Sequence, residues 1–112
     1  MLQLDTHKSL EEFEQAKRSE EGLLVYFSHE ACNVCKVLKP KVKALLDKEF
    51  PNMKMTYADT VNTPEIAGQN GIFTVPTILV FFDGREYIRK SRNIGLEELR
   101  RDIQRPYEMM FE

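Results

Sequence analysis

The stretch that decides the fold lies at residues 23–35 and reads LLVYFSHEACNVC. Its first five residues are hydrophobic or aromatic and have polar neighbours, a pattern that predicts a buried strand over 23–28. Residues 36–50 then carry apolar side chains at helical spacing, which predicts a helix. The chain has only two cysteines, Cys32 and Cys35, and they lie where this strand passes into the N-terminus of this helix.

The position of the cysteines at a helix N-terminus has a chemical consequence. Unpaired backbone N–H groups and the helix dipole favour negative charge there, so a thiolate is stabilised and the pKa of the thiol falls. We expect Cys32 to be the exposed nucleophile that attacks a disulfide. Cys35, one helical turn further on, can then attack the mixed disulfide that Cys32 has formed. The pattern therefore predicts a centre for thiol–disulfide exchange.

Three other interpretations of a close cysteine pair stay open. The pair can be a structural disulfide, although closing so short a loop removes little entropy from the unfolded chain. It can be half of a zinc site, but zinc takes four ligands, and the two histidines, His7 and His29, lack the usual ligand spacing. It can also consist of two inert buried thiols. On these grounds we expect no metal.

Length and composition predict one domain over residues 1–112, large enough for a single core. Hydrophobic residues make up 42% and charged residues 30%, and the net charge of −2 gives no reason to propose nucleic acid or a membrane as a partner. No apolar run approaches the roughly 20 residues that span a bilayer. The first residues also lack the basic and apolar regions of a signal peptide. We therefore expect a cytoplasmic protein, in which such a cysteine pair is more often redox-active or metal-binding than structural.

Periodicity and turn residues predict the remaining elements. Asp83-Gly84 predicts a tight hairpin turn, and Pro40 falls inside the long helix, where we expect a kink. The apolar tail, residues 106–112, either packs on the domain or covers a dimer contact. Further strands are expected at Leu2 to Leu4, 53–58, 77–82 and 86–90, and further helices at about 9–19, at 63–71 and from Gly95 to a stop near Pro106. The resulting order, β-α-β-α-β-α-β-β-α, predicts a mixed sheet with helices on both faces.

This order, with a Cys-x-x-Cys after the second strand, resembles the thioredoxin family over nearly the whole chain. The resemblance implies an α/β, thioredoxin-like fold in which helices flank a central mixed sheet on both faces. It also implies a monomeric disulfide reductase with no metal or organic cofactor. Its substrates would be disulfide-containing proteins, and an unidentified reductase would supply electrons. The matching residues are Phe27, Cys32-x-x-Cys35-Lys36, Pro40, Val75-Pro76-Thr77 and Asp83-Gly84.

The family carries a cis proline at the position of Pro76, facing the cysteines. The resemblance therefore implies that Val75 and Pro76, with Thr74 before them, bind the substrate. In this arrangement the exposed backbone of Val75 pairs with an extended substrate segment, as an added strand would.

Three departures from the family concern the site itself. Ser28 and Ala31 stand at the two positions where the family usually has tryptophan, and the chain has no tryptophan at all. Asn33-Val34 replaces the usual Gly-Pro between the cysteines, and the reduction potential of related proteins depends on these two residues. The family normally has a buried acidic residue under the second cysteine, and Tyr26 stands at that position here.

Without that acid, the proton of Cys35 needs another acceptor. A tyrosine with a pKa near 10 is a poor base at neutral pH, so Tyr26 either orients a water or is a core side chain with a satisfied hydroxyl. His29, three residues before Cys32, either accepts the proton and lowers the thiol pKa or simply faces water. Lys36 is a further candidate for tuning the pKa, or one of several lysines on a solvated helix face.

Two alternative functions stay open. A redox-inactive binding module of the same fold fits the missing tryptophans and the missing acid, whereas the retained cysteines and Val75-Pro76-Thr77 oppose it. A thiol oxidase or isomerase would need an oxidising compartment, which the N-terminus does not indicate.

Overall fold

The structure is a computed structural model that describes residues 4–112. Its strands are β1 (Asp5–Thr6), β2 (Gly22–Ser28), β3 (Lys54–Asp59), β4 (Thr77–Phe82) and β5 (Arg85–Ser91). Its helices are α1 (Leu10–Ser19), α2 (Asn33–Glu49), α3 (Pro64–Gln69) and α4 (Leu96–Phe111). This order of strands and helices along the chain is the one that the sequence predicts.

The strands form one sheet in the order β1-β3-β2-β4-β5, with β2 in the centre. β2 pairs in parallel with β3 and antiparallel with β4, where Phe27 lies opposite Thr77. β1 pairs in parallel with β3, and β5 pairs antiparallel with β4. The sheet is therefore mixed, as predicted. The end of β2 and the beginning of β4 lie side by side, so the chain leaves for the cysteines next to the segment that enters β4.

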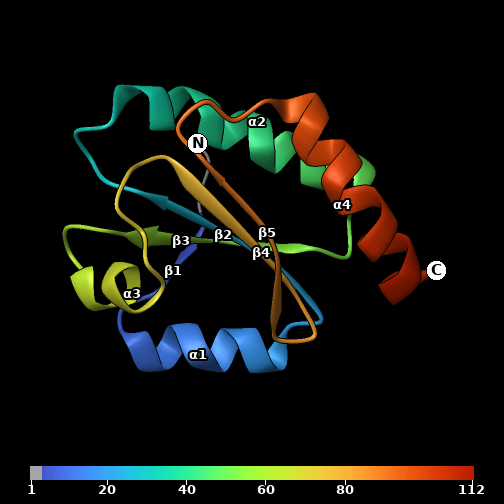
Figure 1. Ribbon diagram of the computed structural model, residues 1–112, viewed down its shortest axis with the longest axis horizontal. Coiled ribbons are helices and arrows are strands. Elements are labelled where there is room, and N and C mark those ends of the chain that lie inside the picture. The colour runs from blue at the N-terminus through green and yellow to red at the C-terminus, as the bar shows by residue number, and fades with distance from the viewer. Residues whose placement is uncertain (1–3) are drawn as a thin grey trace.

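The side chains of β2 alternate between two cores, and all seven of its residues are buried. Leu24 and Tyr26 belong to a cluster with residues of α2 and α4, whereas Val25 and Phe27 belong to a cluster with residues of α1 and α3. Figure 1 shows α2 and α4 above the sheet and α1 and α3 below it. Because β2 is covered on both faces, its sequence is a continuous hydrophobic run. The predicted fold class is confirmed.

The last helix is longer than the sequence predicts. The expected stop near Pro106 is wrong, because α4 continues to Phe111. A proline removes one helical hydrogen bond, but its ring holds φ in the helical range. After it, the buried Tyr107 packs its ring 5.0 Å from that of Phe50 and 4.9 Å from that of Phe111. Its hydroxyl also accepts a hydrogen bond from the Asn52 N–H at 3.1 Å. These contacts offset the missing bond, and they show that the tail packs back on the domain.

The β4–β5 turn agrees with the sequence prediction, whereas the position of the first strand does not. The predicted hairpin at Asp83-Gly84 is confirmed, because both residues have positive φ, 53° and 80°, as a tight β-hairpin turn requires. The first strand, in contrast, lies at Asp5–Thr6, later than the expected Leu2 and Leu4. Of these two, Leu2 lies outside the described residues.

A titratable side chain, His7, is buried where β1 meets α1. His7 is only 5% exposed, its Nε2 lies 2.7 Å from Oγ1 of Thr56, and its ring packs edge-on against Phe13 at 5.4 Å. Burial lowers the pKa of His7. The charges of Glu12 and Asp5 act against this shift without reversing it. The folded protein therefore favours the neutral imidazole of His7 more strongly than the unfolded chain does.

We expect His7 to make the protein less stable in mild acid. Its pKa is about 6.5 in the unfolded chain and lower in the folded one, so below that pH the unfolded state binds the extra proton. Stability should then fall with decreasing pH by at most about 1.4 kcal/mol per pH unit, until the folded pKa is passed. His7→Gln should remove this slope and still offer Thr56 a hydrogen-bond partner. Urea unfolding between about pH 5 and 7.5, a range around the reference pKa, measures the difference. Equal slopes in the two proteins would contradict the prediction.

Candidate active site around Cys32 and Cys35

Cys32 and Cys35 form a disulfide at the start of α2, with their Cα atoms 5.3 Å apart. The two sulfurs differ in accessibility. Cys32 is half-buried, whereas Cys35 is only 1% exposed. Another protein can therefore reach the first cysteine more easily than the second.

The helix that carries the cysteines begins at Asn33, so the cysteines lie at a helix N-terminus and Cys35 lies in the first turn, as the sequence predicts. Cys32 is its N-cap residue, and the Cys35 N–H donates a hydrogen bond to the Cys32 sulfur at 3.2 Å. Cysteine is not among the usual capping residues, so the sequence gives no signal that the Cys32 sulfur caps the helix. The helix continues through Pro40 for 17 residues in all. An N–H group aimed at the sulfur and the positive end of the helix dipole both stabilise negative charge on Cys32.

Tyr26 contacts the second cysteine from the centre of the sheet. Its side chain is fully buried, and its hydroxyl donates a hydrogen bond to the Cys35 carbonyl at 2.7 Å. Burial raises the pKa of Tyr26 above its ordinary value. The hydroxyl therefore stays protonated at neutral pH and cannot accept the Cys35 proton. Tyr26 is a core tyrosine with a satisfied hydroxyl.

A small cleft of about 40 Å³ opens beside the buried Cys35. It is lined by Ser28, His29, Glu30, Cys35, Lys36, Lys39 and Tyr57. Two of the predicted residues, His29 and Lys36, therefore share this cleft with the second cysteine. Lys39 and Tyr57 are further lining residues that sequence reasoning missed, and the Lys39 ammonium lies 4.7 Å from the centre of the Tyr57 ring. The cleft is polar and has room for a water molecule.

The segment of residues 74–76 lies beside the cysteine turn and enters β4. The peptide bond between Val75 and Pro76 is cis. The Thr74 carbonyl accepts a hydrogen bond from Oγ1 of Thr77 at 2.7 Å, and the Pro76 carbonyl accepts one from the Arg92 N–H at 2.9 Å. Val75 packs against the same core cluster as Cys32. The segment is thus held from both sides, and Arg92 is a neighbour that the sequence does not indicate.

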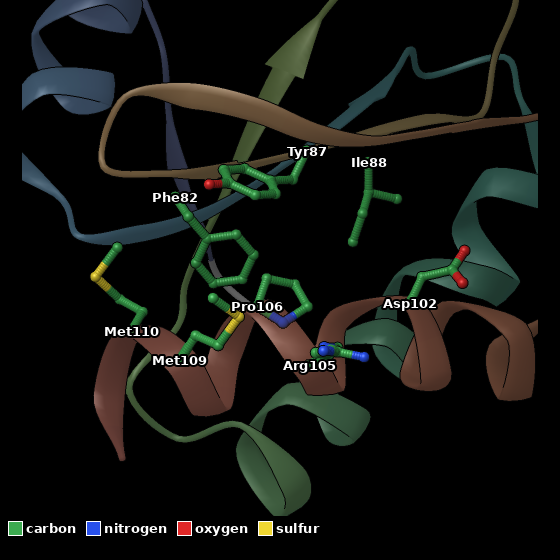
Figure 2. Close-up of a pocket in the computed structure, with 8 residues that line it drawn as sticks. All are labelled: Phe82, Tyr87, Ile88, Asp102, Arg105, Pro106, Met109 and Met110. Atoms are coloured by element: carbon green, nitrogen blue, oxygen red, sulfur yellow. The ribbon is translucent and has the colours of Figure 1, made fainter.

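An apolar groove of about 470 Å³ lies elsewhere, between the β4–β5 hairpin and the C-terminal half of α4. Figure 2 shows Pro106 and Met109 of the helix facing Phe82 and Tyr87 of the hairpin. This groove shares no lining residue with the cleft beside Cys35. It is therefore not part of the cysteine site.

Two structural features are absent from residues 4–112. Within that range, no group of three or more His, Cys, Asp or Glu side chains is arranged to hold a metal ion. Over the same residues, no helix combines the length and the apolar character needed to cross a bilayer.

The fold and the site together define a class of protein. A mixed sheet with helices on both faces carries a Cys-x-x-Cys disulfide at a helix N-terminus, and a cis proline directly precedes the strand that pairs with the end of β2. Such a protein is a thiol–disulfide oxidoreductase with the thioredoxin fold. The chain belongs to the thioredoxin family, since the family model described as Thioredoxin matches residues 5–105.

Individual relatives agree with this assignment. The thioredoxin-like protein YdfQ of Bacillus subtilis is 35% identical over 85 residues, which make up 76% of this chain and 75% of that protein. The thioredoxin of Chlamydia muridarum is 36% identical over 76 residues, or 68% of this chain and 71% of that one. The X-ray structure of Fasciola hepatica thioredoxin superposes with a TM-score of 0.79 at 26% identity, and the match covers 91% of this chain and 98% of that one.

Proposed function

We propose that this protein reduces disulfide bonds in other proteins, with Cys32 as the attacking thiol and Cys35 as the resolving thiol. One observation carries the proposal. The Cys35 N–H points at the Cys32 sulfur, at the half-buried N-cap of a long helix. In the reduced protein the same donor and the helix dipole would stabilise a Cys32 thiolate, which is the nucleophilic form.

The reaction then proceeds in two exchanges. The Cys32 thiolate attacks one sulfur of the substrate disulfide, and the other substrate sulfur leaves as a thiolate that takes up a proton. Cys35 next loses its proton and attacks the Cys32 sulfur, which releases the second substrate sulfur as a thiol. The substrate gains two electrons and two protons, and the protein ends as the Cys32–Cys35 disulfide. An unidentified reductase would return the electrons, and the protein would act as a monomer.

Val75 and Pro76, together with Thr74, are proposed to hold the substrate. Their segment lies beside the turn that leads to the cysteines, and Val75 is half-buried rather than enclosed. An extended substrate segment could pair with the Val75 backbone there, as an added strand does. This pairing would place the substrate disulfide beside the Cys32 sulfur.

The thiol chemistry of Cys32 tests the proposal directly. In a Cys35→Ser variant, we expect Cys32 to titrate below the pKa of about 8.5 of an ordinary cysteine. At neutral pH it should therefore react faster with an alkylating reagent than the same protein unfolded in urea. Rates measured against pH give the pKa of the thiol. A folded protein that alkylates no faster than its unfolded control would count against the proposal.

The direction of the reaction depends on the reduction potential of the pair. A reductase in the cytoplasm requires a potential nearer the roughly −270 mV of thioredoxin than the roughly −120 mV of a strong periplasmic oxidant. Equilibration with buffers of reduced and oxidised glutathione measures it. A value near that of the oxidant would favour the thiol oxidase alternative instead.

His29 is the proposed acceptor of the Cys35 proton, by way of the cleft that both residues line. We expect His29→Gln to slow the second exchange at neutral pH by at least about tenfold, since general base catalysis typically contributes more than that. The difference should shrink as the pH rises and vanish where Cys35 ionises without the help of a base. Stopped-flow decay of a mixed disulfide at a series of pH values measures the rate.

A second variant separates charge from proton transfer. The Lys36 ammonium is proposed to lower the thiol pKa only through its positive charge, so Lys36→Gln should shift the pH profile without lowering its upper plateau. If His29→Gln instead resolves the mixed disulfide at the wild-type rate at every pH, then water or the substrate takes the proton.

A further inference from the structure

Arg92 has an uncommon backbone conformation for an arginine. It lies between β5 and α4 with a φ of 64°, in the left-handed region where a side chain crowds the backbone and glycine is favoured. Its N–H group donates the hydrogen bond to the Pro76 carbonyl. Glycine could make the same bond with less strain. The backbone therefore gives no reason for the arginine side chain at this position.

The exposed Arg92 side chain lines two grooves at the cysteine end of the molecule. It shares one groove, of about 700 Å³, with Val34 and Val37, and the other, of about 440 Å³, with Phe73. These apolar side chains are unusually open to solvent, with exposed fractions of 64% for Val34, 59% for Val37 and 93% for Phe73. An ion pair formed at Arg92 during substrate binding would lie between apolar groups, where electrostatic attraction is stronger than in open water.

The charges of the larger groove do not balance. Its two cations, Arg92 and Lys41, form no ion pair within residues 4–112. Its carboxylate, Glu98, is paired with Lys90. The groove next to Val34, and so next to the cysteines, thus carries unpaired positive charge on a chain whose net charge is −2.

We propose that Arg92, assisted by Lys41, selects substrates that carry an aspartate or glutamate next to the cysteine under attack. This inference rests on the proposed reductase function and names a substrate class for it. The planar guanidinium can bind a carboxylate through two parallel hydrogen bonds, which would orient the substrate beside Pro76 and Cys32. Attraction between the groove and an acidic segment would also speed association. The strained backbone at Arg92 is then retained because the arginine side chain recognises the substrate, although the strain lowers stability.

The test uses the full-length reduced protein and three synthetic peptides. Each peptide holds one disulfide, and they differ only in carrying glutamate, glutamine or lysine beside the attacked cysteine. We expect the second-order rate constant of reduction to fall in that order, with glutamate over glutamine by about fivefold at low salt. The preference should shrink as salt screens the charges. Arg92→Gln should erase it, whereas Arg18→Gln, which removes an exposed arginine from α1 on the other face of the sheet, should leave it intact.

Arg92→Gly provides a readout that a purely structural role would not produce. Relief of the left-handed strain should raise the midpoint of urea unfolding while the preference for the acidic peptide disappears. A variant that is instead less stable, and that reduces all three peptides more slowly by the same factor, would make Arg92 structural only. If the wild-type protein reduces the three peptides equally, this inference is wrong and the proposed function stands. If it reduces none of them, the proposed function fails and the inference with it.

Discussion

Cys32→Ser is expected to abolish disulfide reduction, with the rate falling to that of the uncatalysed reaction. A serine hydroxyl cannot form the mixed disulfide, and the remaining sulfur, that of Cys35, is almost completely buried. The measurement is the reduction of a protein disulfide in the presence of a small dithiol as electron donor. A Cys32→Ser protein that still reduces the substrate above the dithiol background would contradict the assignment of the nucleophile.

Cys35→Ser is the matched control, because it removes the other sulfur and leaves Cys32 in place. This variant should still attack the substrate but stop at the mixed disulfide, which mass spectrometry detects as a covalent adduct. The two variants together separate the first exchange from the second. Adducts on the Cys32→Ser protein instead would reverse the order of attack proposed for the pair.

Tyr26→Asp is expected to have the largest effect on stability, at about 3–5 kcal/mol of lost unfolding free energy. The change leaves a cavity in the centre of the sheet and buries a carboxyl group in its place. Tyr26→Phe is the matched control, since it removes only the hydrogen bond to the Cys35 carbonyl and should cost about 1 kcal/mol. Urea unfolding of the three proteins measures both effects, and similar losses for the two variants would contradict this account.

The same aspartate should change the chemistry of Cys35. Burial would raise its pKa above the unfolded value of about 3.9. The added penalty is therefore absent below that value, grows as the pH rises, and levels off above the folded pKa. If that pKa comes near neutral, the carboxylate can take the Cys35 proton, and the mixed disulfide should resolve faster than in the wild-type protein. Equal rates would mean that His29, water or the substrate already moves the proton.

The fold could be predicted because its decisive signals are local. The hydrophobic run of β2, the Asp83-Gly84 turn and the helical periodicities each act within a few residues. The error at Pro106 has the opposite origin. A proline normally stops a helix, but here Tyr107 finds partners at Phe50 and Asn52, more than fifty residues earlier in the chain. Contacts between segments so distant in sequence leave no pattern in either one.

Some features of the candidate site could likewise be predicted from the sequence, and others could not. Cys32 and Cys35 are evident from their spacing and from the strand and helix around them. The role of the Cys32 sulfur as the cap of α2 could not be predicted, because capping preferences favour oxygen-bearing side chains. The left-handed backbone of Arg92 has no local signal either, since glycine is the residue that usually marks such a position.

The two outer strands of the sheet, β1 and β5, limit its growth in different ways. An outer strand presents unpaired backbone groups on which strands of other molecules can assemble into aggregates. In the part of the chain that the structure describes, residues 4–112, β1 offers two residues for such pairing. β5 offers seven, but its sequence REYIRKS carries four charged side chains that discourage a second copy from aligning along it. The short β1 and the charged β5 thus both disfavour edge-to-edge polymerisation of the sheet that positions the cysteines.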